Sequence, residues 1–252
     1  MTAAELVAAL DLPAEARVDL RVPKKVLLEQ GGFSPADQRA IGDGVKELVW
    51  LAALKPTTIG VPAFRDAERE YLEIAVLRLA LHPGSTGARL AELVHRAVPY
   101  PVVLAVEQDG EATLSLAPKR RSLGDRSKTV LDGEIVEAET AGPAGDGIAA
   151  AFRAALPLRR QPSATIFAVY EGWTDAALAL EAARETGVYE LASSAERAAA
   201  RREALRECRR LVEEIAVLRA EAARETQMTR RVETNLKLQR AHAARAAARA
   251  RL

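Results

Sequence analysis

The sequence has little of three things that define large classes of proteins. Cysteine occurs once in 252 residues, at Cys208, so an internal disulfide and a thiolate-rich zinc site are both excluded. Phe, Trp and Tyr together make up 4% of the residues, which disfavours binding of nucleic acid by rows of stacked rings. No apolar run approaches the roughly 18 residues that a membrane-spanning helix needs. These absences predict a cytoplasmic protein with an aliphatic core.

Charge is distributed unevenly along the chain. The net charge is +1, but residues 196–252 hold 15 Lys+Arg against 8 Asp+Glu, which leaves 21 against 27 in the rest. A body with a charge of −6 therefore carries a tail with a charge of +7. Such a tail favours an acidic or polyanionic partner, and a solvated helix is the alternative explanation for it.

Local patterns predict the elements of the body. Ser34, Pro35 and Asp37 form a helix start, and the apolar spacing after them predicts one helix up to residue 54. Further along, the sequence predicts an interior strand over 69–82, a helix over 88–98, two strands around the hairpin turn Asp109-Gly110, and a strand over 129–140 bent at Gly133. His95 is expected at the edge of the buried face of its helix.

The tail is predicted to be helical throughout. From about residue 194 to residue 252 there is neither proline nor glycine, which indicates a long helix or a helical hairpin. Glu225 and Thr229 interrupt its apolar seam, so any coiled coil is irregular. We expect a partner to bind the residues along this seam, which are Leu211, Ile215, Leu218, Val232, Asn235 and Leu236.

These elements predict a mixed α+β fold, a small mixed sheet flanked by helices and followed by a long C-terminal helical arm. The expected divisions are an α/β body over 1–140, a flexible linker over 141–162, a helical segment over 163–192 and a basic helix or helical hairpin over 193–252.

Two kinds of site can be placed on this fold. A metal-dependent nuclease could use Glu73 and Glu107 on neighbouring strands with Lys119, but the Glu-x-Lys or Asp-x-Lys pair that would orient the lysine is missing. Basic side chains could instead hold phosphates, with a solvated loop as the alternative. The predicted phosphate-binding residues are Lys119, Arg120, Arg121, Arg126 and Lys128 after the hairpin, and Arg230 and Arg231 in the tail.

Six segments of the chain carry a family resemblance: LRVPKKVLLEQGGFSPADQRAI, KELVWLAALKPTTIGVP, REYLEIAVL, LAELVHRAVPYPVVLAV, LSLAPKR and ETQMTRRVETNLKL. They resemble a bacterial family of unknown function associated with phage-defence loci that also encode Swi/Snf-type helicases and DNA methyltransferases. The likeness covers most of residues 20–122 and 224–238.

The resemblance implies a role within a multi-subunit complex. We therefore expect a non-enzymatic accessory subunit that docks a helicase or methyltransferase partner, with nucleic acid contacted through basic residues. This interpretation requires no catalytic residue, metal ion or cofactor. A divergent nuclease and a self-associating coiled-coil scaffold are the two alternatives.

Overall fold

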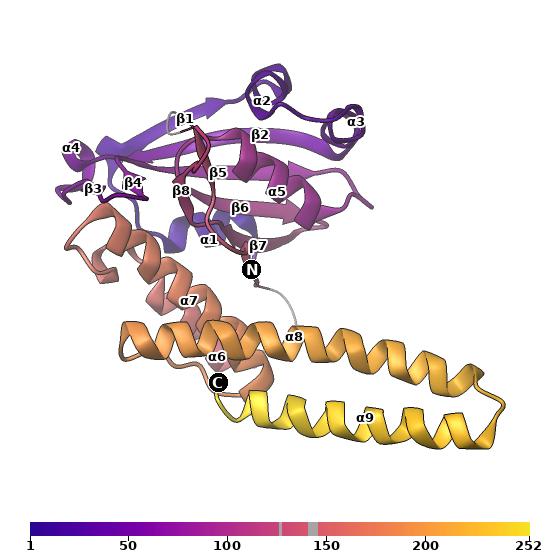
Figure 1. The fold of residues 1–252 in the computed structure, drawn as a ribbon. Helices are drawn as coiled ribbons and strands as arrows, with labels where there is room; N and C mark the ends of the chain where they lie inside the picture. The colour runs from indigo at the N-terminus through magenta and orange to yellow at the C-terminus, as the bar shows by residue number, and fades with distance from the viewer. Residues whose placement is uncertain (126–127, 141–145) are drawn as a thin grey trace. The chain divides into compact units, whose positions relative to one another are not determined.

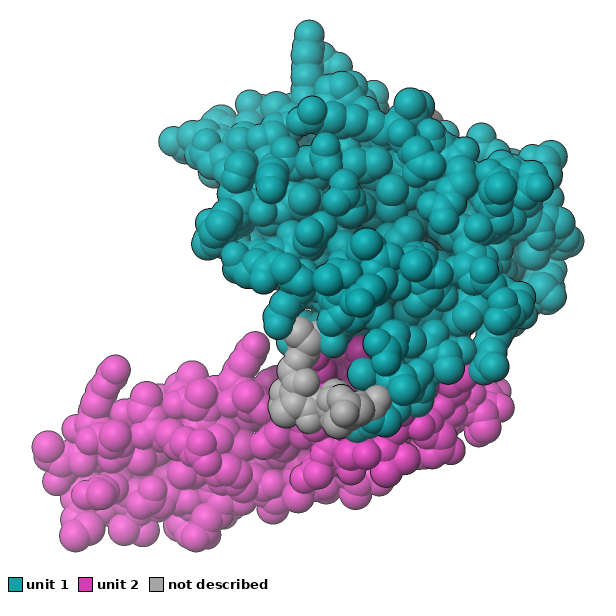
Figure 2. All heavy atoms as spheres, turned by 180° about the vertical axis from the view of Figure 1, so that it is seen from behind, with its two compact units in different colours: residues 1–177 teal, residues 178–252 magenta. Residues whose placement is uncertain are grey.

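The computed structural model describes residues 1–125, 128–140 and 146–252, which form two units. Unit 1 is Met1–Ala177 and unit 2 is Leu178–Leu252 (Figure 2). Unit 1 contains a sheet and the helices that cover it, whereas unit 2 is helical. Helix α7 (Ile166–Thr186) contributes residues to both units.

A mixed sheet of six strands organises unit 1, in the order β1-β2-β5-β6-β7-β10 (Figure 1). Its strands are β1 (Arg17–Arg21), β2 (Val45–Leu54), β5 (Ile74–Leu81), β6 (Val102–Gln108), β7 (Glu111–Leu116) and β10 (Val136–Glu139). Every neighbouring pair is antiparallel except β5 and β6, which are parallel and joined through helix α5 (Gly87–Ala97). Two small ribbons pair β3 (Phe64–Arg65) with β4 (Glu70–Tyr71) and β8 (Lys119–Arg121) with β9 (Thr129–Leu131).

Helices lie on both faces of this sheet. Those of unit 1 other than α5 and α7 are α1 (Ala3–Ala9), α2 (Lys24–Gly31), α3 (Pro35–Gly44), α4 (Pro56–Ile59) and α6 (Asp146–Ala155). Figure 1 shows α2, α3 and α5 on one face and α1 on the other. None of the helices among the residues that the structure describes is long and apolar enough to cross a membrane.

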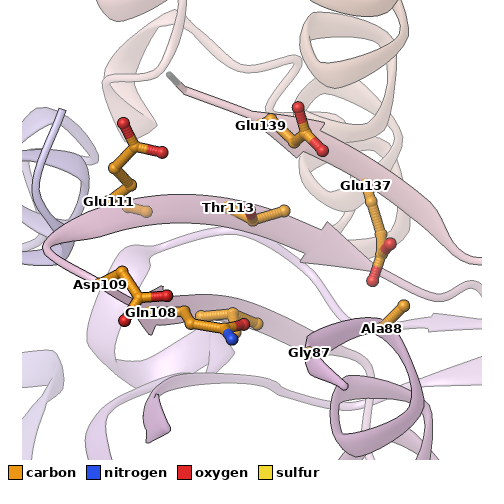
Figure 3. Close-up of a pocket in the computed structure, with 10 residues that line it drawn as sticks. Gly87, Ala88, Gln108, Asp109, Glu111, Thr113, Glu137 and Glu139 are labelled. Carbon is orange, nitrogen blue, oxygen red and sulfur yellow. The ribbon is translucent and has the colours of Figure 1, made fainter. Parts of the chain in front are cut away.

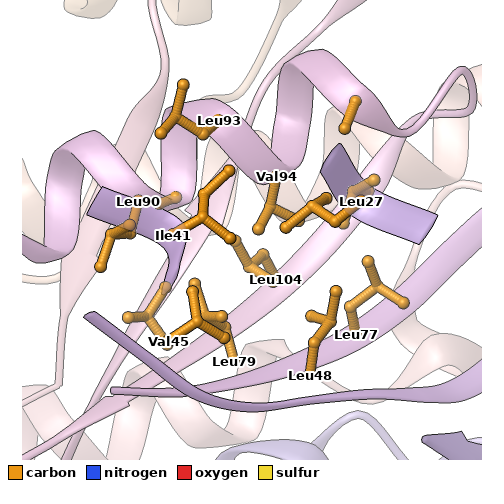
Figure 4. Packing of buried hydrophobic residues seen from close by; sticks show 14 of the residues in the cluster. Leu27, Ile41, Val45, Leu48, Leu77, Leu79, Leu90, Leu93, Val94 and Leu104 are labelled. Carbon is orange, nitrogen blue, oxygen red and sulfur yellow. The ribbon is translucent and has the colours of Figure 1, made fainter. Parts of the chain in front are cut away.

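One hydrophobic core lies between α2, α3, α5 and the sheet (Figure 4). Leu90, Leu93 and Val94 of α5 pack on Leu79 and Leu104, and all five are buried. The predicted helix over 88–98 is confirmed, and aliphatic side chains fill most of the core beneath it.

The predicted helix up to residue 54 is wrong in its second half. The start is as expected, because Ser34 Oγ accepts the Asp37 N–H at 3.2 Å and Pro35 opens α3. The helix ends at Gly44, where a Cβ atom would come within 2.6 Å of the Leu90 side chain. The chain then continues as β2, which is hydrogen-bonded to β1 and β5 on its two sides. Pairing with two strands outweighs the helical spacing of the apolar residues.

The segment 129–140 also differs from its prediction. It forms two strands in different sheets, because β9 pairs with β8 and β10 pairs with β7. Gly133 lies between them with a φ of +93°, which explains why the bend is a complete break. In the range predicted as a linker, residues 146–155 form α6, and 141–145 lie outside the described residues.

Unit 2 is a helical hairpin preceded by the end of α7. Helix α8 (Ala195–Arg224) begins at Ser194, whose hydroxyl accepts the Arg197 N–H at 3.2 Å. Helix α9 (Met228–Arg249) follows after a break at residues 225–227 and packs along α8. Of the two predicted forms of the tail, the structure has the hairpin.

Candidate functional site

The two glutamates of the nuclease alternative lie at opposite ends of adjacent strands. Glu73 immediately precedes β5, and Glu107 is opposite Ala80, near the far end of that strand. Because β5 and β6 run parallel, seven positions separate the two glutamates along the strands, or roughly 23 Å. They cannot bind one metal ion, so the structure contradicts this predicted site.

Each glutamate has a cationic neighbour instead. Glu73 Oε2 lies 3.2 Å from Lys55 Nζ. The Arg78 guanidinium lies between Glu107, at 3.4 Å, and Glu47 of β2, at 2.8 Å. In the described part of the chain, no three His, Cys, Asp or Glu side chains are grouped so that they could hold a metal ion.

The basic residues after the hairpin are largely paired with carboxylates. Arg120 lies 3.7 Å from Asp132, and Arg121 lies 3.1 Å from Glu70. Lys128 lies 3.4 Å from Asp125, and Arg126 is outside the described residues. The positive charge that predicted a phosphate-binding loop is therefore balanced locally. Arg230 and Arg231, the other two predicted contacts, are exposed on α9.

Lys119 does not lie on the surface, although it was predicted to contact phosphates. Its side chain is buried, and Nζ donates to the carbonyl oxygen of His95 at 2.5 Å and to that of Val98. Both carbonyls belong to the C-terminal end of α5, where the helix leaves acceptors unpaired and its dipole favours a cation. Burial lowers the pKa of the Lys119 amine to about 7. Lys119 thus ties β8 to the end of α5.

His95 is completely buried beside this lysine, rather than at the edge of the core as expected. Its Nε2 is 3.0 Å from the hydroxyl of Ser115, which is also fully buried. The other ring nitrogen, Nδ1, has no hydrogen-bond partner among the described residues. Burial, and secondarily the charge of Lys119, lower the pKa of His95 to about 3. The ring is therefore neutral, and Ser115, being buried, is not placed to act as a nucleophile on an external substrate.

Ser115 was missed by sequence reasoning, although the sequence holds a signal for it. It is the single polar residue in the run Leu114 to Leu116, on a strand whose alternate residues face the core. A lone hydroxyl at such a position indicates a buried hydrogen-bond partner, because an unpaired one is costly. The sequence alone does not identify that partner.

A cavity lies where α5, the end of α2 and the β8–β9 ribbon meet. Its volume is about 270 Å³, and its lining includes His95, Arg96, Lys119, Val130 and Leu131. The lining therefore combines nitrogen donors with aliphatic surface, and among the residues that the structure describes it contains no carboxylate.

A second cavity, of about 190 Å³, is lined almost entirely by apolar side chains. We call it the apolar groove, and it is formed by Val22, Val26, Leu27, Gln30, Leu48, Trp50, Ala75, Leu77, Ala97, Val98, Pro99 and Tyr100. Its inner residues Leu48 and Leu77 belong to the core, while Val26 and Tyr100 are 44% and 41% exposed. Large apolar side chains exposed around a concave apolar surface are typical of protein-binding sites.

A third cavity, of about 520 Å³, is acidic. Figure 3 shows Glu137 and Glu139 on β10, Asp109 in the turn from β6 to β7, and Glu111 at the start of β7. Such a lining repels phosphate groups, so this end of the sheet does not suit the backbone of a nucleic acid.

The predicted seam of the arm is divided by the hairpin. Leu211, Ile215 and Leu218 of α8 are buried in a cluster with Ala241 of α9. A docking partner therefore cannot use these three while the hairpin is formed, because α9 already covers them. The remaining predicted residues, Val232, Asn235 and Leu236, are exposed on α9.

Comparison with known proteins places the chain in a family. No curated protein and no solved structure matches the chain. Residues 10–244 match a protein family described as domain of unknown function (DUF4391), and the match runs through both units. Since it covers far more than half of the sequence, the chain belongs to the DUF4391 family.

Proposed function

We propose that this protein is a non-enzymatic accessory subunit whose α/β body docks a protein partner through the apolar groove. The observation that carries the proposal is the groove itself, a concave and almost wholly apolar surface beside exposed Val26 and Tyr100. Burial of one bulky apolar anchor in such a pocket is the usual source of affinity at protein interfaces. The groove is large enough for one leucine or phenylalanine side chain.

The surroundings of the groove favour an acidic partner segment. Arg21 and Lys25 lie next in sequence to the lining residues Val22 and Val26, and their side chains are 72% and 85% exposed. Their nearest carboxylates, Glu47 and Glu29, are 3.8 Å away, beyond hydrogen-bonding distance. A segment with an apolar anchor flanked by Asp or Glu would match both the pocket and its rim. The resemblance to proteins of phage-defence loci supports a helicase or DNA methyltransferase subunit as the partner.

Replacing Val26 with aspartate is expected to weaken partner binding at least about tenfold, because a carboxylate would be desolvated in the apolar groove. Val26 is half-exposed on α2, so the variant should fold normally. The measurement is co-purification of the tagged chain with a candidate helicase and a candidate DNA methyltransferase subunit, followed by titration of the retained protein.

Leu123→Asp is the matched control, because Leu123 is 87% exposed and lies outside the groove. It should bind like the wild type. The proposal fails if neither enzyme is retained, or if Val26→Asp retains as much partner as Leu123→Asp does.

A second role, contact of the arm with a polyanion, is favoured by the charge of α9. This helix holds six Lys and Arg residues and one acidic residue, and Arg230 and Arg231 are exposed. Guanidinium groups on a helix of this kind bind phosphates with release of counterions.

Replacing both Arg230 and Arg231 with alanine should flatten the salt dependence of binding to a DNA duplex. The slope of log K against log salt concentration should decrease by roughly 2, since each phosphate contact contributes about 0.9. The control pair is Arg206→Ala with Arg210→Ala, because those side chains bind Glu203 and Glu207 on α8. Binding that is independent of salt, or an equal change in the control, would contradict this role.

A further inference from the structure

The cavity beside Lys119 holds polar groups that the fold leaves unused. His95 is completely buried, yet Nδ1 has no hydrogen-bond partner among the described residues. A buried nitrogen without a partner destabilises the fold unless something binds it. A protonated Lys119 has three hydrogens, and the carbonyl oxygens of His95 and Val98 take two of them. Both residues line the same cavity.

Among the titratable side chains that line this cavity, Arg96 and Lys119 are cations and His95 is neutral, and Arg96 Nη1 lies 3.7 Å from Glu92 Oε1 one turn earlier on α5. Helix α5 contributes His95 and Arg96, and β8 contributes Lys119. Gly31 of α2 and residues 129–131 of β9 add no charge. Beyond the lining, Tyr71 of β4 accepts the backbone N–H of Lys119 at 3.0 Å, and Asp132 after β9 is engaged by Arg69 at 2.9 Å. Asp132 is therefore already paired, and Glu92 beside Arg96 also accepts a hydrogen bond from Arg89 at 2.6 Å.

We propose that this cavity is a binding site for a small oxyanion, a carboxylate or a phosphate, held by Lys119, Arg96 and Nδ1 of His95. The oxyanion would select the neutral His95 tautomer with its proton on Nδ1, while the Ser115 hydroxyl donates to Nε2. Val130 and Leu131 would contact the apolar body of an organic carboxylate. The site is independent of the apolar groove, which none of these three residues lines.

Binding at this site is coupled to a proton. Burial lowers the pKa of Lys119 to about 7, and only the ammonium form of this side chain attracts an anion. Below pH 7 the site is charged and affinity is constant. Above pH 7 the Lys119 amine is mostly neutral and must be protonated for the anion to bind. The affinity therefore falls by about tenfold per pH unit, up to the pH at which the amine also loses its proton in the complex.

The test uses the full chain with sodium acetate and inorganic phosphate as separate probes. Calorimetry at pH 7 in two buffers of different ionisation enthalpy should give saturable binding with net proton uptake for at least one probe. Which probe binds more tightly distinguishes an organic carboxylate from a phosphate. Affinity should be about tenfold lower at pH 8 than at pH 6.

Arg96→Met is the variant of choice, because the side chain is 41% exposed and its loss should leave the fold intact. It should weaken anion binding at least about tenfold. Lys128→Met is the matched control, since it removes one charge from the same ribbon region without lining the cavity, and it should bind like the wild type. The proposal is overturned if neither probe saturates, if no proton is taken up, or if both variants change affinity equally.

Discussion

Replacing Lys119 with methionine is expected to lower the free energy of unfolding by about 2–4 kcal/mol. Methionine fills nearly the same space, so packing is largely preserved. It donates no hydrogen bond, however, and the carbonyl oxygens of His95 and Val98 would remain unpaired beside a buried side chain. Burial of the lysine amine is itself unfavourable, and the variant removes this cost. The expected loss of stability is therefore smaller than two unpaired carbonyl oxygens alone would cause.

Urea unfolding of the wild type, Lys119→Met and Lys128→Met measures this effect. The control removes the same charge from a side chain that is 75% exposed, so it should change stability by no more than about 0.5 kcal/mol. A loss below about 1 kcal/mol in Lys119→Met would show that the amine does not hold the end of α5.

Acidification should destabilise the wild type through His95, by about 2 kcal/mol between pH 7.5 and 5. Burial, together with the charge of Lys119, lowers the pKa of His95 to about 3, against an ordinary value of 6.5. Between these two pH values the unfolded chain binds a proton at His95, whereas the folded chain does not. The contribution of His95 is therefore present above pH 6.5 and is lost progressively as the pH falls.

His95→Gln should remove this pH dependence, because glutamine does not titrate and can still hydrogen-bond Ser115. Because the substitution itself changes the stability at pH 7.5, the quantity to compare is the change in unfolding free energy between pH 7.5 and 5. Wild type and variant should differ in that change by about 2 kcal/mol. Parallel curves would mean that the ring is protonated in the folded protein.

The elements that the sequence predicts best are those with a local chemical signature. Asp109-Gly110 forms the turn between β6 and β7 with φ values of +52° and +83°, as this residue pair favours. Ser34 similarly caps α3. In both cases the deciding interactions lie within a few residues, so the sequence contains everything needed.

The candidate sites could not be predicted in the same way, because they depend on tertiary arrangement. Nothing local shows that β5 and β6 are parallel, and this direction places Glu73 and Glu107 far apart. Likewise, the apolar spacing of Leu211 and Ile215 predicts a covered surface but does not say that α9 covers it. Lys119 was misassigned to a basic loop because its neighbours Arg120 and Arg121 share its charge but not its burial.

The order of the strands in the sheet has a consequence for how the chain folds. The intervening chain is 19 residues long between β2 and β5, 20 between β5 and β6, and 19 between β7 and β10. It is longest between β1 and β2, at 23 residues, and shortest at the turn between β6 and β7. Loop-closure entropy rises only slowly with such lengths. Each strand therefore finds its partner in the segment made just before it, and the sheet can assemble in chain order during synthesis without waiting for a distant strand.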